Sequence, residues 1–366
     1  MKKLILLLAI CVQTAFSQSV LDLDFGFSGL YAFNENNKWG YVDVEGKIII
    51  PAKYKSAENF SNGLGKVSVD GNNYGYIDKS GTLIFKTIYF SGTDFTDGAA
   101  FVSIKKGNDV QWNVLNKNGE LYPVAKFSYK GTFCEGLARV KTQSDLWGFI
   151  DTKGKFVIEP KYESAGDFSE GLCCVSIKNR WGFINAKGEM IIQPQFTTIG
   201  KMEFTKGLAG VRLHEERENG LYKTGFIDKS GVLQNTDWLK KIDDEAKYEV
   251  RSVGDPHDGF SIVYASGENF AIINTQGEIL MDFKHFDLLY DFSNGLAAFQ
   301  EANEAHNGLW GFINEKGEEI IKAQYSVLTS FDQNGLAFFE KKEGALIVNG
   351  YLNKTGKIIK HWSYKG

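Results

Sequence analysis

Short apolar segments separated by polar turns recur along the whole chain. In one copy, the apolar run Trp-Gly-Tyr-Val at 39–42 ends in Asp43, Gly46 follows three residues later, and a second apolar run begins at Ile48. Along an extended strand, the two aromatic side chains of the first run point to one side, and glycine and valine point to the other. Apolar residues on both sides predict a strand that is covered on both faces.

The turn between the two apolar runs has the same chemistry in every copy. An Asp or Asn side chain caps a type I turn by bonding to its own backbone. The glycine three residues later takes a left-handed conformation that closes a three-residue hairpin loop. Calcium loops use the same residue types, but Ca²⁺ takes about six to eight oxygen ligands, and only one recurs per copy. The pattern therefore predicts hairpin turns and no metal site. The nine turns are Asp43–Gly46, Asp78–Gly81, Asn116–Gly119, Asp151–Gly154, Asn185–Gly188, Asp228–Gly231, Asn274–Gly277, Asn314–Gly317 and Asn353–Gly356.

A second phrase, which starts with phenylalanine and ends in Gly-Leu, separates the copies and leads into a third strand. It occupies residues 60–64, 133–137, 168–172, 204–208 and 292–296. Each unit therefore has about three strands over roughly 35–45 residues. One unit cannot bury two apolar faces alone, so we expect neighbouring units to stack, with glycine allowing close backbone approach.

The combined pattern, Trp-Gly-[Tyr/Phe]-Ile-[Asp/Asn]-x-x-Gly with Phe-Ser-x-Gly-Leu-Ala between copies, resembles the WG (or KWG) repeat family of bacterial proteins over roughly residues 30–359. The resemblance implies an all-β repeat array without known catalytic residues and with a suspected role in interactions. The structural repeat residues are Trp39, Trp112, Trp147, Trp181, Trp310, Gly46, Gly81, Gly154, Gly188 and Gly317. Copies that depart from the pattern, at Asn113, Thr224, Ala271 and Asn349, are expected to pack less well.

Two architectures bury both faces of such strands. One is an open β-solenoid or superhelical array of about nine roughly three-stranded repeats. The other is a closed β-propeller-like ring, which is built from about four to eight blades of four strands. Nine unevenly spaced copies of about three strands favour the open array. Residues 236–247 break the strand pattern, and the spacing of Leu239, Ile242 and Ala246 predicts one short inserted helix.

The N-terminus has the pattern of a secretory signal peptide. A basic start at Lys2 and Lys3 precedes an apolar run, and small residues stand before Gln18. We expect residues 1–17 to be removed and residues 18–366 to form the repeat array. The apolar run is shorter than the roughly 20 residues that span a bilayer. The chain is therefore expected to be exported to the periplasm, the cell surface or the extracellular space, and not to span a membrane.

Charge and cysteine content narrow the possible partners. The formal net charge is −4, and loss of Lys2 and Lys3 lowers it by two, which argues against nucleic acid as a partner. Removal of the signal peptide leaves Cys134, Cys173 and Cys174, an odd number. Cys173 stands where other copies have alanine and is interpreted as a small buried residue. A bridge from Cys134 to Cys173 or Cys174 is the alternative.

Loop length suggests where function lies, because the loops before each Trp-Gly vary while the Asx–Gly turns do not. Loops that vary along one edge of a stack mark a candidate binding edge, here Glu215, Glu216, Arg217, Glu218, Glu301, Glu304 and His306. None of the five histidines lies in a metal-ligand spacing or beside a nucleophile motif.

We therefore expect a monomeric, non-catalytic scaffold without cofactor that binds a protein or glycan in the cell envelope. The alternatives are a purely structural spacer and a glycan-acting enzyme that uses carboxylates such as Asp243 and Asp244.

Overall fold

The computed structural model describes residues 29–197, 203–216, 222–234, 249–302 and 308–365. These residues form strands, turns and irregular connections, and no helix occurs among them. The helix predicted at 236–247 and the signal peptide predicted at 1–17 lie outside the described residues. The chain divides into two compact units, with the boundary after Pro160.

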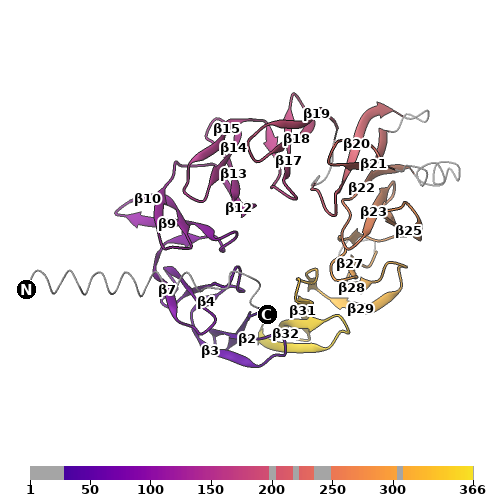
Figure 1. The fold of residues 1–366 in the computed structure, drawn as a ribbon. Coiled ribbons are helices and arrows are strands. Elements are labelled where there is room, and N and C mark those ends of the chain that lie inside the picture. The colour runs from indigo at the N-terminus through magenta and orange to yellow at the C-terminus, as the bar shows by residue number, and fades with distance from the viewer. Residues whose placement is uncertain (1–28, 198–202, 217–221, 235–248, 303–307, 366) are drawn as a thin grey trace, which may run out of the picture. The chain divides into compact units, whose positions relative to one another are not determined.

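The first unit contains three antiparallel sheets and most of a fourth, and in each sheet the strands follow one another in chain order (Figure 1). We call these sheets blades 1 to 4. Blade 1 comprises β1 (Tyr31–Glu35), β2 (Lys38–Val42) and β3 (Ile48–Tyr54). Blade 2 comprises β4 (Ser56–Ala57), β5 (Gly65–Ser68), β6 (Tyr74–Ile77) and β7 (Leu83–Tyr89). Blade 3 comprises β8 (Ser91–Gly92), β9 (Ala99–Lys106), β10 (Asp109–Asn116) and β11 (Leu121–Pro123). Blade 4 comprises β12 (Tyr129–Cys134), β13 (Leu137–Lys141), β14 (Trp147–Asp151) and β15 (Phe156–Tyr162).

The second unit contains blades 5 to 8 with the same topology. Blade 5 comprises β16 (Ser164–Ala165), β17 (Leu172–Ile177), β18 (Arg180–Asn185), β19 (Met190–Phe196), β20 (Leu208–Glu216) and β21 (Tyr222–Asp228). Blade 6 comprises β22 (Val250–Val253), β23 (Phe260–Ala265), β24 (Asn269–Asn274) and β25 (Ile279–His285). Blade 7 comprises β26 (Leu288–Leu289), β27 (Ala297–Gln300), β28 (Trp310–Ile313) and β29 (Glu319–Tyr325). Blade 8 comprises β30 (Val327–Leu328), β31 (Leu336–Glu343), β32 (Leu346–Asn353) and β33 (Ile358–Lys365).

The repeating element is thus a four-stranded antiparallel meander, not a three-stranded unit. Such a meander is the blade of a β-propeller, and eight sheets fall within the range of propeller blade numbers. The fold is that of an eight-bladed β-propeller, and the prediction of an open solenoid was wrong. Nine Asx–Gly turns occur on eight sheets because blade 5 contains two: its hairpin β20–β21 joins β19 only through the residue pair Phe196–Leu213.

The Asx–Gly turns have the predicted geometry in all nine copies. The turn glycines have φ values from +71° to +85°, and each donates its N–H to the carbonyl of the preceding Asx residue. In the first copy, Asp43 Oδ1 accepts the amide hydrogens of Glu45 at 3.0 Å and Lys47 at 2.9 Å. The carboxylate or amide oxygen is therefore used within its own turn.

The glycine of the Trp-Gly pair does not mediate the predicted close approach between neighbouring units. Tyr54 lies opposite Trp39 and Ile50 opposite Tyr41, so three residues of β3 face the single Gly40. A Cβ atom on Gly40 would lie 2.5 Å from the Ile50 carbonyl oxygen and 2.7 Å from the Ala52 nitrogen. The close approach is therefore to the outer strand of the same blade, which bulges over the glycine, and not to a neighbouring unit. The outer strand β3 continues through Pro51.

Copies that lack this glycine have a smaller bulge or none. In blade 6, Ala271 replaces it and one extra residue of β25 is accommodated, between Lys284 and Met281. In blade 3, Asn113 replaces it, and the pairing with β11 is regular. Asn113 and Ala271 are at most 4% exposed, so these two copies change the pairing of the outer strand while the substituted positions stay buried. Thr224 replaces a tryptophan, is followed by Gly225 and is also buried.

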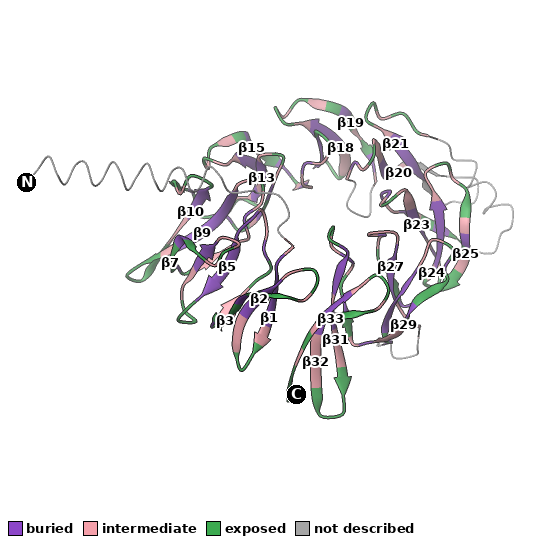
Figure 2. Ribbon diagram, turned by 60° about the horizontal axis from the view of Figure 1, so that its bottom comes forward, coloured by how far each residue is buried: buried purple, intermediate pink, exposed green. Residues whose placement is uncertain are grey.

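Successive blades within each unit share their apolar cores, as the two apolar faces of each strand predict. In blade 5, Phe183 packs with Phe196, Phe204 and Ile227, the last of which belongs to the hairpin β20–β21. Between blades 7 and 8, Phe312 packs with Phe339 and Leu352. Figure 2 shows buried residues along the middle strands and exposed residues at the turns.

In most repeats the fully buried aromatic residue is the third residue and not the tryptophan, whereas Val114 and Ile272 hold this position in blades 3 and 6. Tyr41, Tyr76, Phe149, Phe183 and Phe312 are at most 1% exposed. Trp39, Trp112, Trp147 and Trp181 are half-buried, whereas Trp310 is 8% exposed. The tryptophans are instead paired across the bulge with an aromatic residue of the outer strand, as in Trp181–Phe196 and Trp310–Tyr325.

The second phrase links each repeat to the next through hydrogen bonds. Its serine hydroxyl donates to the phenylalanine carbonyl of the following phrase: Ser61 to Phe95, Ser169 to Phe204 and Ser293 to Phe331, at 2.6–2.7 Å. The side chain of Asn59 accepts the N–H of Ala32 in the preceding blade at 2.8 Å. Asp255 accepts the N–H groups of Gly210 at 2.7 Å and Glu203 at 3.0 Å in the same way. Burial raises the pKa of Asp255 to about 6, and these two hydrogen bonds oppose the shift.

We predict that Phe183→Ala lowers the free energy of unfolding of the purified protein by roughly 3–5 kcal/mol, because it removes a buried ring between blade 5 strands and β21. Trp181→Ala should lower it by about half as much, because that ring is only partly buried. Urea unfolding followed by circular dichroism measures both values. A larger loss for Trp181→Ala would contradict the assignment of the buried aromatic residue.

We also predict that Gly311→Ala destabilises the protein by about 1–3 kcal/mol, because the added methyl would lie 2.5 Å from the Ile321 carbonyl oxygen. Ala271→Gly is the matched control, since blade 6 already accommodates a methyl group with a smaller bulge, and it should change stability by less than about 1 kcal/mol. Thermal unfolding compares the two variants. Equal losses would show that the bulge does not depend on glycine.

Asp255→Asn is predicted to alter the pH dependence of stability. Because the folded pKa of about 6 lies above the usual 3.8, the native state retains a proton that the unfolded state has released between these pH values. The contribution of Asp255 to stability is therefore fully present below about pH 4 and is lost as pH rises through 6. The stability advantage of wild type over Asp255→Asn should shrink by roughly 2–3 kcal/mol from pH 4 to pH 7. Urea titrations across this range would refute the assignment if the difference stayed constant.

Candidate functional site

The hairpins between the second and third strands of the blades, which in the three-stranded blade 1 lie between β1 and β2, differ in length, and we call the edge that they form within each unit the variable edge. Residues 36–37, 107–108, 178–179 and 344–345 make two-residue hairpins, residues 69–73 and 142–146 make five-residue loops, and residues 301–309 make a nine-residue loop. The Asx–Gly turns at the other end of the third strand are constant in length. Sequence variation that the fold does not dictate is therefore concentrated at the variable edge.

The predicted binding-edge residues are only partly within the described residues. Glu215 and Glu216 end β20, and nothing is described of their side chains. Glu301 is exposed, and its N–H donates to the Leu309 carbonyl across the base of the long loop at 2.9 Å. Arg217, Glu218, Glu304 and His306 lie outside the described residues. The described residues do not bring this predicted set together into one site.

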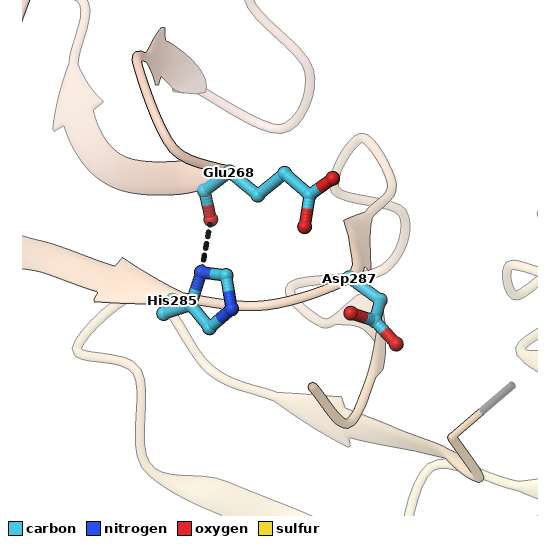
Figure 3. Close-up of side chains that lie close together, drawn as sticks. All are labelled: Glu268, His285 and Asp287. Carbon is cyan, nitrogen blue, oxygen red and sulfur yellow. Dashed lines mark hydrogen bonds between the residues drawn. The ribbon is translucent and has the colours of Figure 1, made fainter. Parts of the chain in front are cut away.

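A different group of side chains meets at the variable edge of blade 6. Glu268 lies in the hairpin between β23 and β24, His285 ends β25, and Asp287 directly precedes β26. One ligand-type atom from each side chain lies within 4.8 Å of those of the other two, and Figure 3 shows the three side chains. Glu268 and His285 are exposed, whereas Asp287 is 7% exposed. In the described part of the chain, this trio is the one group with the spacing of metal ligands.

Backbone pairing brings Glu268 close to His285 and Asp287, which follow it in the sequence by 17 and 19 residues. Asn269 lies opposite His285 in the register of β24 and β25, and the N–H of Phe286 donates to the Glu268 carbonyl at 3.3 Å. The N–H of Asp287 is bonded to the Gln300 carbonyl of blade 7 at 3.2 Å. The trio therefore spans two successive blades. Sequence spacing alone did not reveal it, because the register of a hairpin with a bulge is needed to place Glu268 beside His285.

The ring of His285 is oriented by the backbone of that hairpin. Its Nδ1 lies 3.0 Å from the Gly267 carbonyl oxygen and 3.2 Å from that of Glu268. Carbonyl oxygens only accept hydrogen bonds, so Nδ1 carries the hydrogen. The other ring nitrogen, Nε2, lies on the side of the ring that faces the Asp287 carboxylate (Figure 3).

A second charged cluster, between blades 2 and 3, is used for packing. Lys66 is 9% exposed, and its Nζ donates to the Gly92 carbonyl at 2.7 Å and lies 2.8 Å from Glu58 Oε1. Burial raises the pKa of Asp94 to about 6; the nearby Glu58 also raises it, and Lys66 lowers it. A buried ammonium group between carboxylates and a carbonyl of the adjacent blade is a satisfied structural pair.

The three described cysteines are free thiols. The predicted alternative of a bridge from Cys134 is therefore wrong. Cys173 is 1% exposed, at a position where the equivalent Ala138 and Ala209 are also buried, as predicted for a small buried residue. No helix in the described part of the chain is long and apolar enough to cross a membrane.

Similar solved structures are distant. BamB from Moraxella catarrhalis is 11% identical, with a TM-score of 0.45 and coverage of 90% of this chain and 94% of that one. The dihydro-heme d1 dehydrogenase NirN in complex with DHE is 10% identical, with a TM-score of 0.46 and coverage of 92% and 73%. Apo AztD from Citrobacter koseri is 11% identical, with a TM-score of 0.40 and coverage of 91% and 93%. At TM-scores below 0.5, these likenesses support no functional inference. No curated protein sequence matches the chain.

The sequence model described as "WG containing repeat" matches six segments that together cover more than half of the chain. The matched residues are 39–72, 74–108, 147–181, 181–215, 270–304 and 310–344. Each segment begins at or next to the third strand of a blade and carries one Asx–Gly turn. The chain therefore belongs to the family of proteins that contain WG repeats.

Proposed function

We propose that this WG-repeat protein is a non-catalytic binding scaffold whose interaction surface is the variable edge. The observation that carries the proposal is the contrast between the two ends of the third strand. The Asx–Gly turns are the same in nine copies, whereas the hairpins at the variable edge range from two residues to nine. Binding residues concentrate on loops that a rigid scaffold positions.

The recurrent residues support this division, because their chemistry is already used by the fold. The Asx side chains bond within their own turns, the glycines accommodate bulges, and the third aromatic residue fills the space between blades. A repeated catalytic group is not required to explain any of these positions. Recognition then falls to the residues that differ from blade to blade.

The proposed partner is a protein or glycan of the cell envelope, met after export directed by residues 1–17. The basic start, the apolar run and the small residues before Gln18 support export. A purely structural spacer is the competing function. It would need the same stacked blades and would make no specific contacts at the variable edge.

A direct test shortens the long loop of blade 7. Residues 301–309 would be replaced by Asn-Gly, which suits a two-residue hairpin, in a chain of residues 18–366. The matched control, Glu315→Ser with Lys316→Ser, removes one negative and one positive charge from the Asx–Gly turn of the same blade and keeps Asn314 and Gly317. The wild-type chain would be screened against envelope proteins and purified surface glycans, and each ligand found would be titrated against all three proteins.

We expect the shortened variant to bind at least tenfold more weakly than wild type and the control variant to bind unchanged. Equal binding by the shortened variant would remove this loop from the interaction surface. Failure of the wild-type chain to retain any envelope protein or glycan would contradict the binding function in favour of the spacer.

Export makes a separate prediction. Expressed with its own N-terminus in a bacterial host, the protein should be recovered outside the cytoplasm with Gln18 as its first residue, as measured by intact mass and N-terminal sequencing. A cytoplasmic protein that retains residues 1–17 would contradict the proposed location.

A further inference from the structure

We propose that Glu268, His285 and Asp287 bind one divalent transition-metal ion of the zinc class at the variable edge, between blades 6 and 7. The inference does not rest on the proposed binding function. It rests on the convergence of three ligand-type side chains and on the orientation of the histidine ring.

The three side chains come from two backbone segments, the hairpin at 266–268 and the stretch 285–287, which hydrogen bonds hold in place. Glu268 has φ of +56° in the hairpin that joins β23 and β24. The N–H of Phe286, which follows His285, bonds to the carbonyl of Glu268, and the N–H of Asp287 bonds to Gln300 of blade 7. Ligand atoms within 4.8 Å of one another need small side-chain adjustments to reach the roughly 3–3.5 Å separations that follow from metal–ligand bonds of about 2.0–2.2 Å.

The histidine is oriented as metal-binding histidines are. Such a residue donates the hydrogen of one ring nitrogen to a backbone carbonyl or carboxylate, which fixes the tautomer and leaves the other nitrogen for the metal. In His285, Nδ1 donates to the carbonyls of Gly267 and Glu268. In the tautomer with its one hydrogen on Nδ1, the lone pair is on Nε2, which faces the Asp287 side of the trio (Figure 3).

The acid that directly precedes the first strand of a blade can reach the variable edge. Asp287 is 7% exposed. The equivalent residue of blade 5, Glu163, is exposed and instead accepts the N–H groups of Lys178 and Asn179 in its own hairpin at 3.1 and 3.0 Å. An acidic residue at this position can therefore reach the variable edge. In blade 7 this residue is Asp287, which lies near His285 there.

Ligand type selects the class of ion. Imidazole nitrogen suits Zn²⁺ and its neighbours in the first transition row, whereas Mg²⁺ and Ca²⁺ prefer oxygen ligands. One nitrogen and two carboxylates also fall short of the roughly six to eight oxygens that Ca²⁺ takes. With three protein ligands, a tetrahedral Zn²⁺ has a fourth position for water or for a donor atom of a bound partner.

The test uses the full chain of residues 18–366, stripped of metal with a chelator and dialysed. Calorimetric titration with ZnCl₂ measures stoichiometry and affinity, and the visible absorption of added Co²⁺ reports the ligand geometry. The variants are His285→Ala, Asp287→Asn and Glu268→Gln. His361→Ala is the control, because that histidine is exposed on β33, apart from the trio.

We expect one equivalent of Zn²⁺ per chain, a Co²⁺ absorption band of intensity typical of four-coordinate sites, and affinity at least 100-fold lower in His285→Ala and Asp287→Asn. Glu268→Gln should bind more weakly than wild type, and His361→Ala should match wild type. Circular dichroism of each metal-free variant checks that the fold is retained.

Two results would overturn the proposal. The first is wild-type affinity for Zn²⁺ no greater than that of His285→Ala. The second is a ¹⁵N NMR spectrum in which His285 carries hydrogens on both ring nitrogens at neutral pH with excess Zn²⁺ present. The second result would assign the trio to an ion pair between an imidazolium ring and two carboxylates.

Discussion

The packing of an aromatic ring from the third strand of most blades against the next set of strands is the interaction on which the remaining structure depends. Tyr41, Tyr76, Phe149, Phe183 and Phe312 are nearly or fully inaccessible to solvent, and the clusters that surround Phe183 and Phe312 contain residues of the following strands or blade. A four-stranded sheet with apolar side chains on both faces has no stable state of its own, because one layer cannot bury them. Stability of each blade is therefore coupled to its neighbours within a unit.

The packing between blades explains the structural role of the Trp-Gly phrase. Glycine lets the outer strand bulge over the third strand, so that Trp181 and Phe196, or Trp310 and Tyr325, pair across the bulge. Where Asn113 stands in its place, the outer strand runs straight. The glycine of the phrase thus accommodates the bulge of the outermost strand, and the tryptophan is not the centre of the core.

Local chemistry explains which parts of the fold could be predicted from the sequence. The nine turns were predictable because Asx capping and a left-handed glycine act within four residues. The number of strands per blade was not, because the first strand is as short as Ser56–Ala57 or Val327–Leu328 and two residues show no periodicity. That missing strand made the three-stranded unit, and hence the solenoid, the better match to the sequence. The sequence also did not show that most of the tryptophans are only half-buried.

The candidate site could not be predicted from the sequence for a related reason. His285 and Asp287 are close in sequence, but Glu268 joins them only through the register of a bulged hairpin and the connection to the next blade. The predicted binding-edge residues were chosen by loop length and charge. These features indicate an edge of the fold, but they do not show which side chains lie close together. The edge and the trio nevertheless coincide in place, since Glu268 lies in one of the hairpins that define it.

Hydrogen exchange of the amides in Phe312→Ala tests the coupling between blades most directly. Phe312 belongs to β28 of blade 7, and its ring stacks on Phe331, with centroids 4.4 Å apart, and packs with Leu352 of blade 8. Loss of the ring should lower protection by a similar factor in β27 and β28 and in β31 and β32 of the next blade, because neither blade is stable without the other. Loss of protection confined to blade 7, with blade 8 unchanged, would contradict the account that the blades stabilise one another.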